Sequence, residues 1–137
     1  MRSAARIWRG VLAALLAAAL MLAAPGAAAR DEFARVEGIG VIRVAALPAE
    51  GRQVLAAIHA GGPYGFRRDG IVFGNRESLL PRRSRGYYAE FTVPTPGSAT
   101  RGARRIIAGR GSNGDYRTSN EYYYTNDHYQ SFRRIEQ

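Results

Sequence analysis

The chain has 137 residues, no cysteine and a formal net charge of +9 at pH 7, from 20 basic and 11 acidic side chains. The lack of cysteine excludes disulfides, thiolate-based zinc and iron–sulfur sites, and a lipid anchor on cysteine. Every basic residue is an arginine, and so basic a small chain favours a polyanionic partner. Composition alone equally allows arginines that only keep the protein soluble.

Residues 1–29 have the pattern of a secretory signal peptide. Three arginines in the first nine residues precede an apolar run over residues 11–24, and Ala27–Ala29 form a small-residue cleavage site before Arg30. The run is shorter than the roughly 20 residues that cross a bilayer, so cleavage is favoured over a permanent anchor. We therefore predict a secreted protein with an N-terminal arm and first strand over 30–43 and a single domain over 44–137. Cleavage leaves 137 − 29 = 108 residues and a charge of 9 − 3 = +6.

A short strand and a helix are the first predicted elements. Residues 41–44 are apolar enough for a strand. The helix is expected to begin near Pro48, because proline is tolerated in a first turn, and Glu50 interacts favourably with the positive end of the helix dipole. Apolar residues at helical spacing follow over 54–58, and the Gly-Gly-Pro sequence at 61–63 ends the helix.

Strand patterns separated by turn residues follow the helix. Strands are predicted over residues 71–73, 87–93, 101–108, 122–125 and 131–135, with a Gly-, Ser- and Asn-rich loop over 109–120. In the 87–93 strand the odd-numbered residues share the core face, whereas Tyr88, Glu90 and Thr92 share the polar face. The pattern predicts an α+β fold in which one N-terminal helix packs on an antiparallel β-sheet.

Several side chains on these elements suit chemistry on a phosphate. Glu90 is expected on a rigid strand yet open to solvent, as a general base requires. Arg101 and Arg105 share one face of their predicted strand, and their planar guanidinium groups can bind a phosphate through paired hydrogen bonds. His128 follows in a turn, next to Tyr129, whose ring suits stacking on a base.

Together these groups are the parts needed to cleave RNA through its own 2′-hydroxyl. One group takes the 2′ proton, another protonates the departing 5′-oxygen, and cations stabilise the phosphorane. No cofactor and no metal are expected, because the substrate carries its nucleophile and because His59 and His128 lack a metal-ligand spacing. His59 is expected to be a solvated side chain. Each feature alone is more often a surface ion pair or a polar turn residue, but their joint occurrence on a basic secreted chain favours RNA cleavage.

Five motifs in order resemble the microbial guanyl-specific ribonucleases, the barnase family. They are Asp69–Ser78 (DGIVFGNRES), Gly86–Val93 (GYYAEFTV), Thr95–Gly97 (TPG), Thr100–Ile107 (TRGARRII) and Tyr124–Tyr129 (YTNDHY). The small secreted actinobacterial members are the most similar. The resemblance covers residues 44–137 and implies the family's fold, a helix packed on an antiparallel sheet.

The resemblance also implies roles in catalysis. Glu90 matches the family's general base and His128 its general acid. Arg101 and Arg105 match the phosphate-binding arginines, and Arg76 lies where the family has a further active-site arginine.

Guanine recognition is implied for the segment after the 71–73 strand. Glu77 would accept hydrogen bonds from N1–H and the exocyclic amine, and the backbone N–H groups of Asn75 and Arg76 would donate to O6. Phe73 and Tyr129 would pack on the ring. Adenine would leave the Glu77 carboxylate unpaired, which is costly in a partly dry pocket.

Three departures from the family pattern have consequences. Gly74 replaces a bulkier polar residue that is common in the most similar members, but this position acts mostly through its backbone. The family's usual disulfide is missing, with Arg43 where its first cysteine would fall, so lower stability is expected. The loop over 109–121 looks longer than usual.

The implied partner is single-stranded RNA, with a small acidic inhibitor of the barstar kind as a second candidate. The mature protein is expected to be a monomer without membrane contact. One alternative is a non-catalytic secreted module that binds nucleic acid. A carboxylate such as Glu90 in a phosphate site weakens binding, which argues against that alternative. Another is a ribonuclease toxin paired with an inhibitor.

Overall fold

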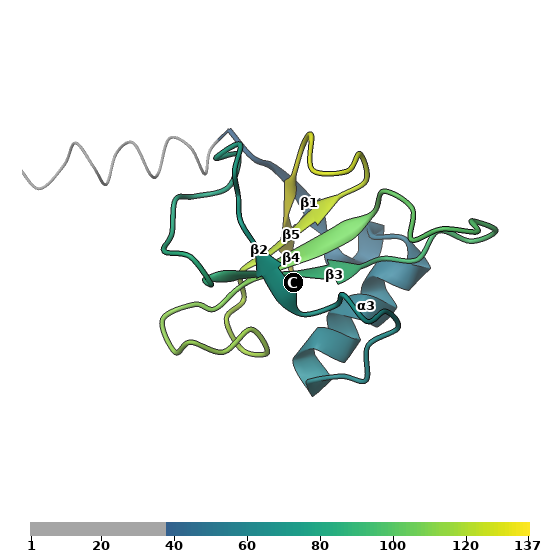
Figure 1. Ribbon diagram of the computed structural model, residues 1–137, viewed down its shortest axis with the longest axis horizontal. Coiled ribbons are helices and arrows are strands. Elements are labelled where there is room, and N and C mark those ends of the chain that lie inside the picture. Colours follow the sequence, from purple (N-terminus) through teal and green to yellow (C-terminus); the bar gives the residue numbers. More distant parts are fainter. Residues whose placement is uncertain (1–37) are drawn as a thin grey trace, which may run out of the picture. The chain divides into compact units, whose positions relative to one another are not determined.

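The computed structural model describes residues 38–137, so the predicted signal peptide and residues 30–37 of the arm lie outside the described residues. The elements are β1 (Gly40–Arg43), the 3-10 helix η1 (Val44–Ala46), α3 (Ala49–Ala60), β2 (Ile71–Phe73), β3 (Tyr88–Thr92), β4 (Arg105–Gly109), β5 (Tyr122–Thr125) and β6 (Arg133–Glu136). Figure 1 shows the helix α3 beside the sheet. Between residues 38 and 137 no helix is long and apolar enough to span a membrane.

The helix α3 has the predicted bounds. It begins after Pro48, and it ends where Gly61 adopts a left-handed backbone with φ of 79°, a conformation that glycine accepts without a steric penalty. The N–H of Gly61 closes the helix by donating to the carbonyl of Ile58, at 3.1 Å. Leu55 and Ile58 are buried against the sheet, as their helical spacing indicates.

The six strands form one sheet in the order β1-β6-β5-β4-β3-β2. All neighbours are antiparallel except β1 and β6, which run parallel with Ile42 opposite Ile135. The α+β class is confirmed, and the sheet is mixed rather than wholly antiparallel. Because α3 follows β1, the chain leaves one edge of the sheet and returns at the other with β2.

Both faces of the sheet carry apolar clusters. On one face Ala89, Phe91 and Val93 of the β3 region pack with Leu55 and Ile58 of α3, so the predicted alternation of that strand is correct there. The opposite face carries a second cluster, made of Leu80, Tyr88, Ile107, Tyr123 and Phe132. The expectation of one core face and one open polar face was therefore wrong, because chain segments outside the sheet cover the second face.

Three strands begin later than the sequence patterns indicate. Tyr87 precedes β3 and packs with the second cluster rather than with α3, since Gly86 before it has a φ of 90° and makes a turn. Residues 101–104 were predicted as strand but are irregular, because Gly102 has a φ of 66°. β6 begins at Arg133, two residues later than expected.

Candidate active site

The face of the sheet opposite α3 carries a row of polar side chains across three strands. Thr92 of β3 pairs with Arg105 of β4, which pairs with Thr125 of β5. Glu90 lies two residues from Thr92 on the same face. All four side chains are buried, so the row forms a rigid polar floor beside the second apolar cluster.

Glu90 is buried, with 7% of its surface exposed, whereas the sequence indicated an open side chain. Tyr129 and Arg101 contact its carboxylate and help to cover it, and Tyr129 also packs against the second apolar cluster. Each carboxylate oxygen has a donor: the Tyr129 hydroxyl donates to Oε2 at 2.7 Å, and Nη2 of Arg101 donates to Oε1 at 3.4 Å. A buried carboxylate held by these donors keeps a fixed position.

Arg101 reaches Glu90 from outside the strand. Its Nε and Nη2 donate to the Thr92 hydroxyl at 3.1 and 2.7 Å, which fixes the guanidinium next to the carboxylate. The prediction that Arg101 and Arg105 face the same site is retained, although Arg101 is not a strand residue. Arg104 has the opposite orientation, with an ion pair of 3.6 Å to Glu50 of α3.

Arg105 is held rigidly and has spare hydrogen-bonding capacity. Its Nη1 donates to the carbonyls of Gly102 and Arg104, at 2.9 and 2.7 Å. Its buried Nε has no acceptor within residues 38–137. Its Cζ lies 5.9 Å from the centre of the Tyr129 ring. A buried cation with an unmet donor is the arrangement expected where an anion binds.

His128 lies in a tight turn that Asp127 holds together. His128 and Tyr129 both have positive φ, of 57° and 71°, which is unfavourable for side chains of this size. The Asp127 carboxylate accepts hydrogen bonds from the Thr125 hydroxyl and from the N–H of Ser131, at 2.8 and 3.0 Å. The Ser131 hydroxyl also donates to this carboxylate, and that bond has the largest effect on its pKa. Together the bonds lower the pKa of Asp127 to about 2. The turn leaves the His128 ring exposed, 4.9 Å from the ring of Tyr129.

The segment predicted to read guanine is a loop fastened by Asn75. The Asn75 amide donates to the Leu80 carbonyl at 2.9 Å and accepts from the Leu80 N–H at 3.1 Å. Asn75 and Ser78 have positive φ, of 47° and 54°. In the described chain the N–H groups of Asn75 and Arg76 find no internal acceptor, so they remain available to a ligand. Glu77 is exposed.

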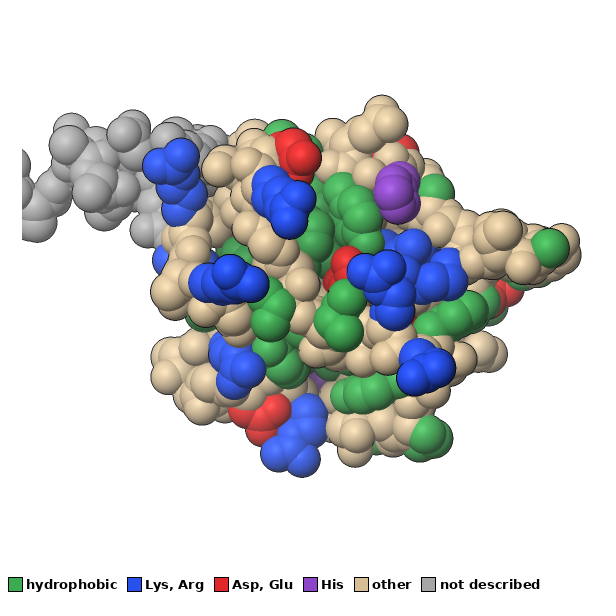
Figure 2. All heavy atoms as spheres, in the orientation of Figure 1, with side chains coloured by type: hydrophobic (Ala, Val, Ile, Leu, Met, Phe, Trp, Pro, Cys, Tyr) green, Lys and Arg blue, Asp and Glu red, His purple; other side chains and the backbone are tan. Residues whose placement is uncertain are grey.

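All ten predicted site residues line one cleft of about 830 Å³, which we call the active-site cleft. They are Phe73, Gly74, Asn75, Arg76, Glu77, Glu90, Arg101, Arg105, His128 and Tyr129. On the face shown in Figure 2, an acidic side chain lies beside a group of arginines, with a histidine nearby. No group of three potential metal ligands occurs within residues 38–137.

Three features of the site were not anticipated from the sequence. Arg68 lines it, yet its only signal was a cation before the Asp69-Gly70 turn. Thr92 positions Arg101, and its place two residues after Glu90 on the same strand face could have identified it. The Tyr129 ring lies 5.1 Å from that of Phe73, but its hydroxyl also contacts Glu90, a contact that the sequence did not indicate.

A basic cleft with a held carboxylate, two fixed arginines and a turn histidine defines a class of protein that acts on phosphate esters. Comparison with known proteins makes this specific: the family model described as ribonuclease matches residues 31–136, and the chain belongs to the ribonuclease family.

Individual relatives are similar over most of the domain. The chain is 50% identical over 103 residues to guanyl-specific ribonuclease Sa3 of Kitasatospora aureofaciens, covering 75% of this chain and 68% of that protein. It is 48% identical over 98 residues to guanyl-specific ribonuclease Sa of the same organism, covering 72% and 95%. A solved structure of ribonuclease Sa2 complexes with mononucleotides aligns with a TM-score of 0.64 and 43% identity, covering 72% and 95%. Another, of ribonuclease Sa2 with guanosine-2′-cyclophosphate, aligns with a TM-score of 0.62, 43% identity and coverage of 72% and 96%.

Proposed function

We propose that this protein is a guanyl-specific endoribonuclease that cleaves single-stranded RNA on the 3′ side of guanosine. The observation that carries the proposal is the active-site cleft. In it a carboxylate, a histidine and two arginines lie beside a loop whose backbone N–H groups are available to a ligand. Relatives about 50% identical are named guanyl-specific ribonucleases, and one solved structure contains a guanosine cyclophosphate.

The first chemical step is transesterification. Glu90 takes the proton of the 2′-hydroxyl, the 2′-oxygen forms a bond to phosphorus, and the bond from phosphorus to the 5′-oxygen breaks. His128 gives its proton to that departing oxygen, so the products are a 2′,3′-cyclic phosphate and a 5′-hydroxyl. Arg101 and Arg105 stabilise the charge that builds on the phosphorane oxygens.

The second step is hydrolysis of the cyclic phosphate. Glu90 and His128 exchange roles: His128 removes a proton from water, water attacks phosphorus, and Glu90 returns the proton to the 2′-oxygen. A 3′-phosphate results. Because one group must be deprotonated and the other protonated in each step, the rate of cleavage has a bell-shaped dependence on pH.

Guanine is selected by the loop after β2. The Glu77 carboxylate accepts from N1–H and the exocyclic amine, and the N–H groups of Asn75 and Arg76 donate to O6. The two hydrogen bonds between the Asn75 side chain and the Leu80 backbone support this role, because they fix the loop conformation before RNA binds. Phe73 supplies the apolar surface for the base.

Secretion, partners and oligomeric state belong to the same proposal. The N-terminal pattern of residues 1–29 supports export followed by cleavage. The mature chain acts as a monomer. A small acidic inhibitor of the barstar kind would pair with Arg101, Arg105 and their basic neighbours. A toxin role would use the same enzyme, whereas a non-catalytic binding module would have no use for a carboxylate next to the phosphate site.

Three single variants test the assignments on an RNA that contains one guanosine. Glu90→Gln and His128→Gln are each expected to lower kcat by on the order of 10²-fold or more, as positioned acid–base groups do. Glu77→Gln is expected to weaken the preference for guanosine over adenosine. Glu136→Gln, at the exposed end of β6, makes the same chemical change outside the cleft and serves as the control. Full activity in both the Glu90 and the His128 variants would refute the catalytic assignment.

A further inference from the structure

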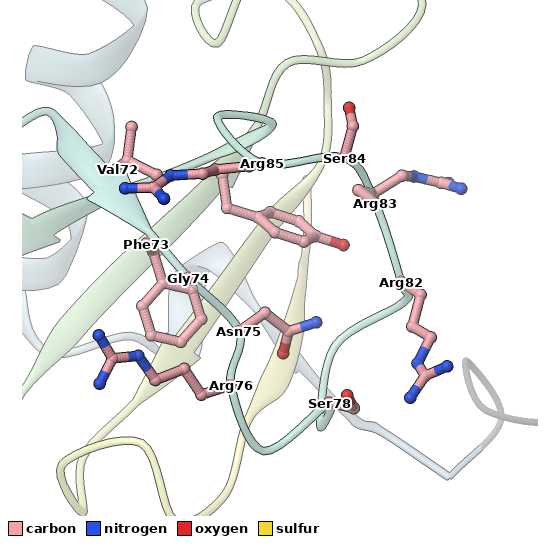
Figure 3. A pocket seen from close by; sticks show the side chains of 11 residues that line it. Val72, Phe73, Gly74, Asn75, Arg76, Ser78, Arg82, Arg83, Ser84 and Arg85 are labelled. Atoms are coloured by element: carbon pink, nitrogen blue, oxygen red, sulfur yellow. The ribbon is translucent and has the colours of Figure 1, made fainter.

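A second cleft adjoins the active-site cleft. It has a volume of about 600 Å³, and its wall over residues 72–76 is shared with the active-site cleft. The other wall is the segment over residues 82–85, and Tyr88 of β3 also lines the cleft. Figure 3 shows the two walls as separate stretches of chain, with Phe73 and Asn75 on one and Arg82 to Arg85 on the other. We call this the arginine cleft.

Its charge is of one sign only. Four arginines line it: Arg76, Arg82, Arg83 and Arg85. All four are exposed, and among the described residues that line this cleft none is acidic. In the view of Figure 3, Arg76 and Arg85 extend in the same direction from the two walls. The active-site cleft differs, because Glu77 and Glu90 lie among its cations.

Of the arginines on the 82–85 wall, only Arg83 has a described contact with the rest of the protein. Arg83 has its guanidinium 5.2 Å from the centre of the Tyr87 ring and so helps to cover that ring. Arg82 and Arg85, by contrast, form no hydrogen bond or ion pair with any residue that the structure describes. Like charges held on both sides of a cleft repel one another, and a bound anion relieves that repulsion.

The shared wall connects this charge to the substrate. In the proposed function, residues 74–77 hold the guanosine of the substrate. The RNA strand bound there therefore continues past the loop that separates the two clefts. The arginine cleft also offers apolar surface, since Phe73 is half-buried and Val72 exposed. A basic groove with apolar and aromatic surface is suited to single-stranded nucleic acid without preference for sequence.

We infer that the arginine cleft binds the phosphate backbone of the same RNA strand, one or more nucleotides away from the reacting guanosine. Arg82 and Arg85 supply the contacts that are separate from catalysis. The site contributes affinity for long single-stranded RNA and no base preference. The inference rests on the proposed function, since it assumes that the strand enters through the guanosine loop.

The test compares two double variants on two substrates. Arg82→Gln/Arg85→Gln removes two charges from the arginine cleft. Arg43→Gln/Arg67→Gln removes two charges from exposed arginines that line neither cleft. The substrates are a guanosine-containing dinucleotide, which is too short to reach the second cleft, and a 12-nucleotide RNA with one central guanosine. Binding of the same 12-mer with 2′-O-methyl groups gives a readout that does not depend on cleavage.

Only the Arg82/Arg85 variant is expected to change the response to the long strand. Its kcat/KM on the 12-mer should fall about tenfold at low salt, and the slope of log affinity against log salt should become shallower by about 1.4, from two lost phosphate contacts. Its kcat/KM on the dinucleotide should stay unchanged. Equal losses in both double variants, or no loss on the 12-mer, would overturn the inference. If the unaltered protein cleaved neither substrate, the proposed function would fall, and binding of the 2′-O-methyl strand would still decide the inference.

Discussion

Gly74 begins the guanosine loop in a backbone conformation that other residues accept, because its φ lies outside the left-handed region. A Cβ there would lie 3.6 Å from Cγ of Arg76, an ordinary contact. Gly74→Ala is therefore expected to raise the free energy of unfolding by about 0.4–1 kcal/mol, because the unfolded chain loses freedom. Preference for guanosine should be unchanged, since the loop acts through its backbone. Urea unfolding and cleavage of a mixed-base RNA measure the two effects.

Gly109 provides the contrasting control for that variant. A Cβ at this position would lie 2.6 Å from Oε2 of Glu121, whose carboxylate is held by the hydroxyls of Tyr87 and Tyr123. Gly109→Ala should thus cost about 1–3 kcal/mol through overpacking. If Gly74→Ala destabilised the protein as strongly as Gly109→Ala, the account of the loop backbone would be wrong.

Single residues differ in how much their sequence neighbourhood reveals. Alternation along β3 correctly placed Glu90 on the face opposite Phe91. It did not indicate that Glu90 is buried, because the second apolar cluster on this face includes Leu80, which comes from a segment without strand or helix periodicity. The contact between Glu90 and Tyr129 joins residues 39 positions apart, and local patterns carry no information at that separation.

At the scale of elements, the turn over residues 125–131 decides whether His128 can act. Asp127 fastens this turn, and hydrogen bonds from Ser131 and its neighbours lower the pKa of the carboxyl to about 2. A carboxyl with a lowered pKa contributes stability above its unfolded pKa, near 4, and loses that contribution as pH falls through its folded pKa. The contribution is therefore complete at neutral pH and disappears between about pH 4 and pH 2.

Asp127→Asn should consequently destabilise the protein at pH 7, and the difference from the unaltered protein should shrink as pH falls from about 4 to 2. It should also lower kcat more than it raises KM, because the guanosine loop is unaffected while the His128 backbone loses its support. Urea unfolding at several pH values and steady-state kinetics measure both effects. A stability difference that stayed constant down to pH 2 would contradict this role for the carboxylate.

Glycine and proline made the boundaries of two elements predictable. The bounds of α3 follow from Pro48 and Gly61, and β2 from the Asp69-Gly70 turn. Residues 101–104 were wrongly predicted as part of a strand, because Arg101, Ala103 and Arg105 alternate as strand residues do. Gly102 has a left-handed backbone, and the pairing of β4 with β3 begins only at Arg105.

At the scale of the whole molecule, strand partners were the least accessible feature. Apolar periodicity indicates that a segment is a strand but not which strand it joins, so the parallel pairing of β1 with β6 could not be foreseen. The pairing brings Arg43 opposite Glu136, near the C-terminal end of the chain.

The site was more predictable than the sheet, because all ten proposed residues line one cleft. The arginine cleft could not be predicted, because it depends on how the 82–85 segment folds against residues 72–76.

The central claim is that the cleft cleaves RNA after guanosine through the RNA's own 2′-hydroxyl. Digestion of a defined single-stranded RNA in EDTA, with mapping of both product ends, tests it directly. We expect cuts only on the 3′ side of guanosine, with 2′,3′-cyclic phosphate ends that slowly become 3′-phosphates, and 5′-hydroxyl ends on the other fragments. Products with 5′-phosphate ends, or no cleavage in EDTA, would contradict the claim.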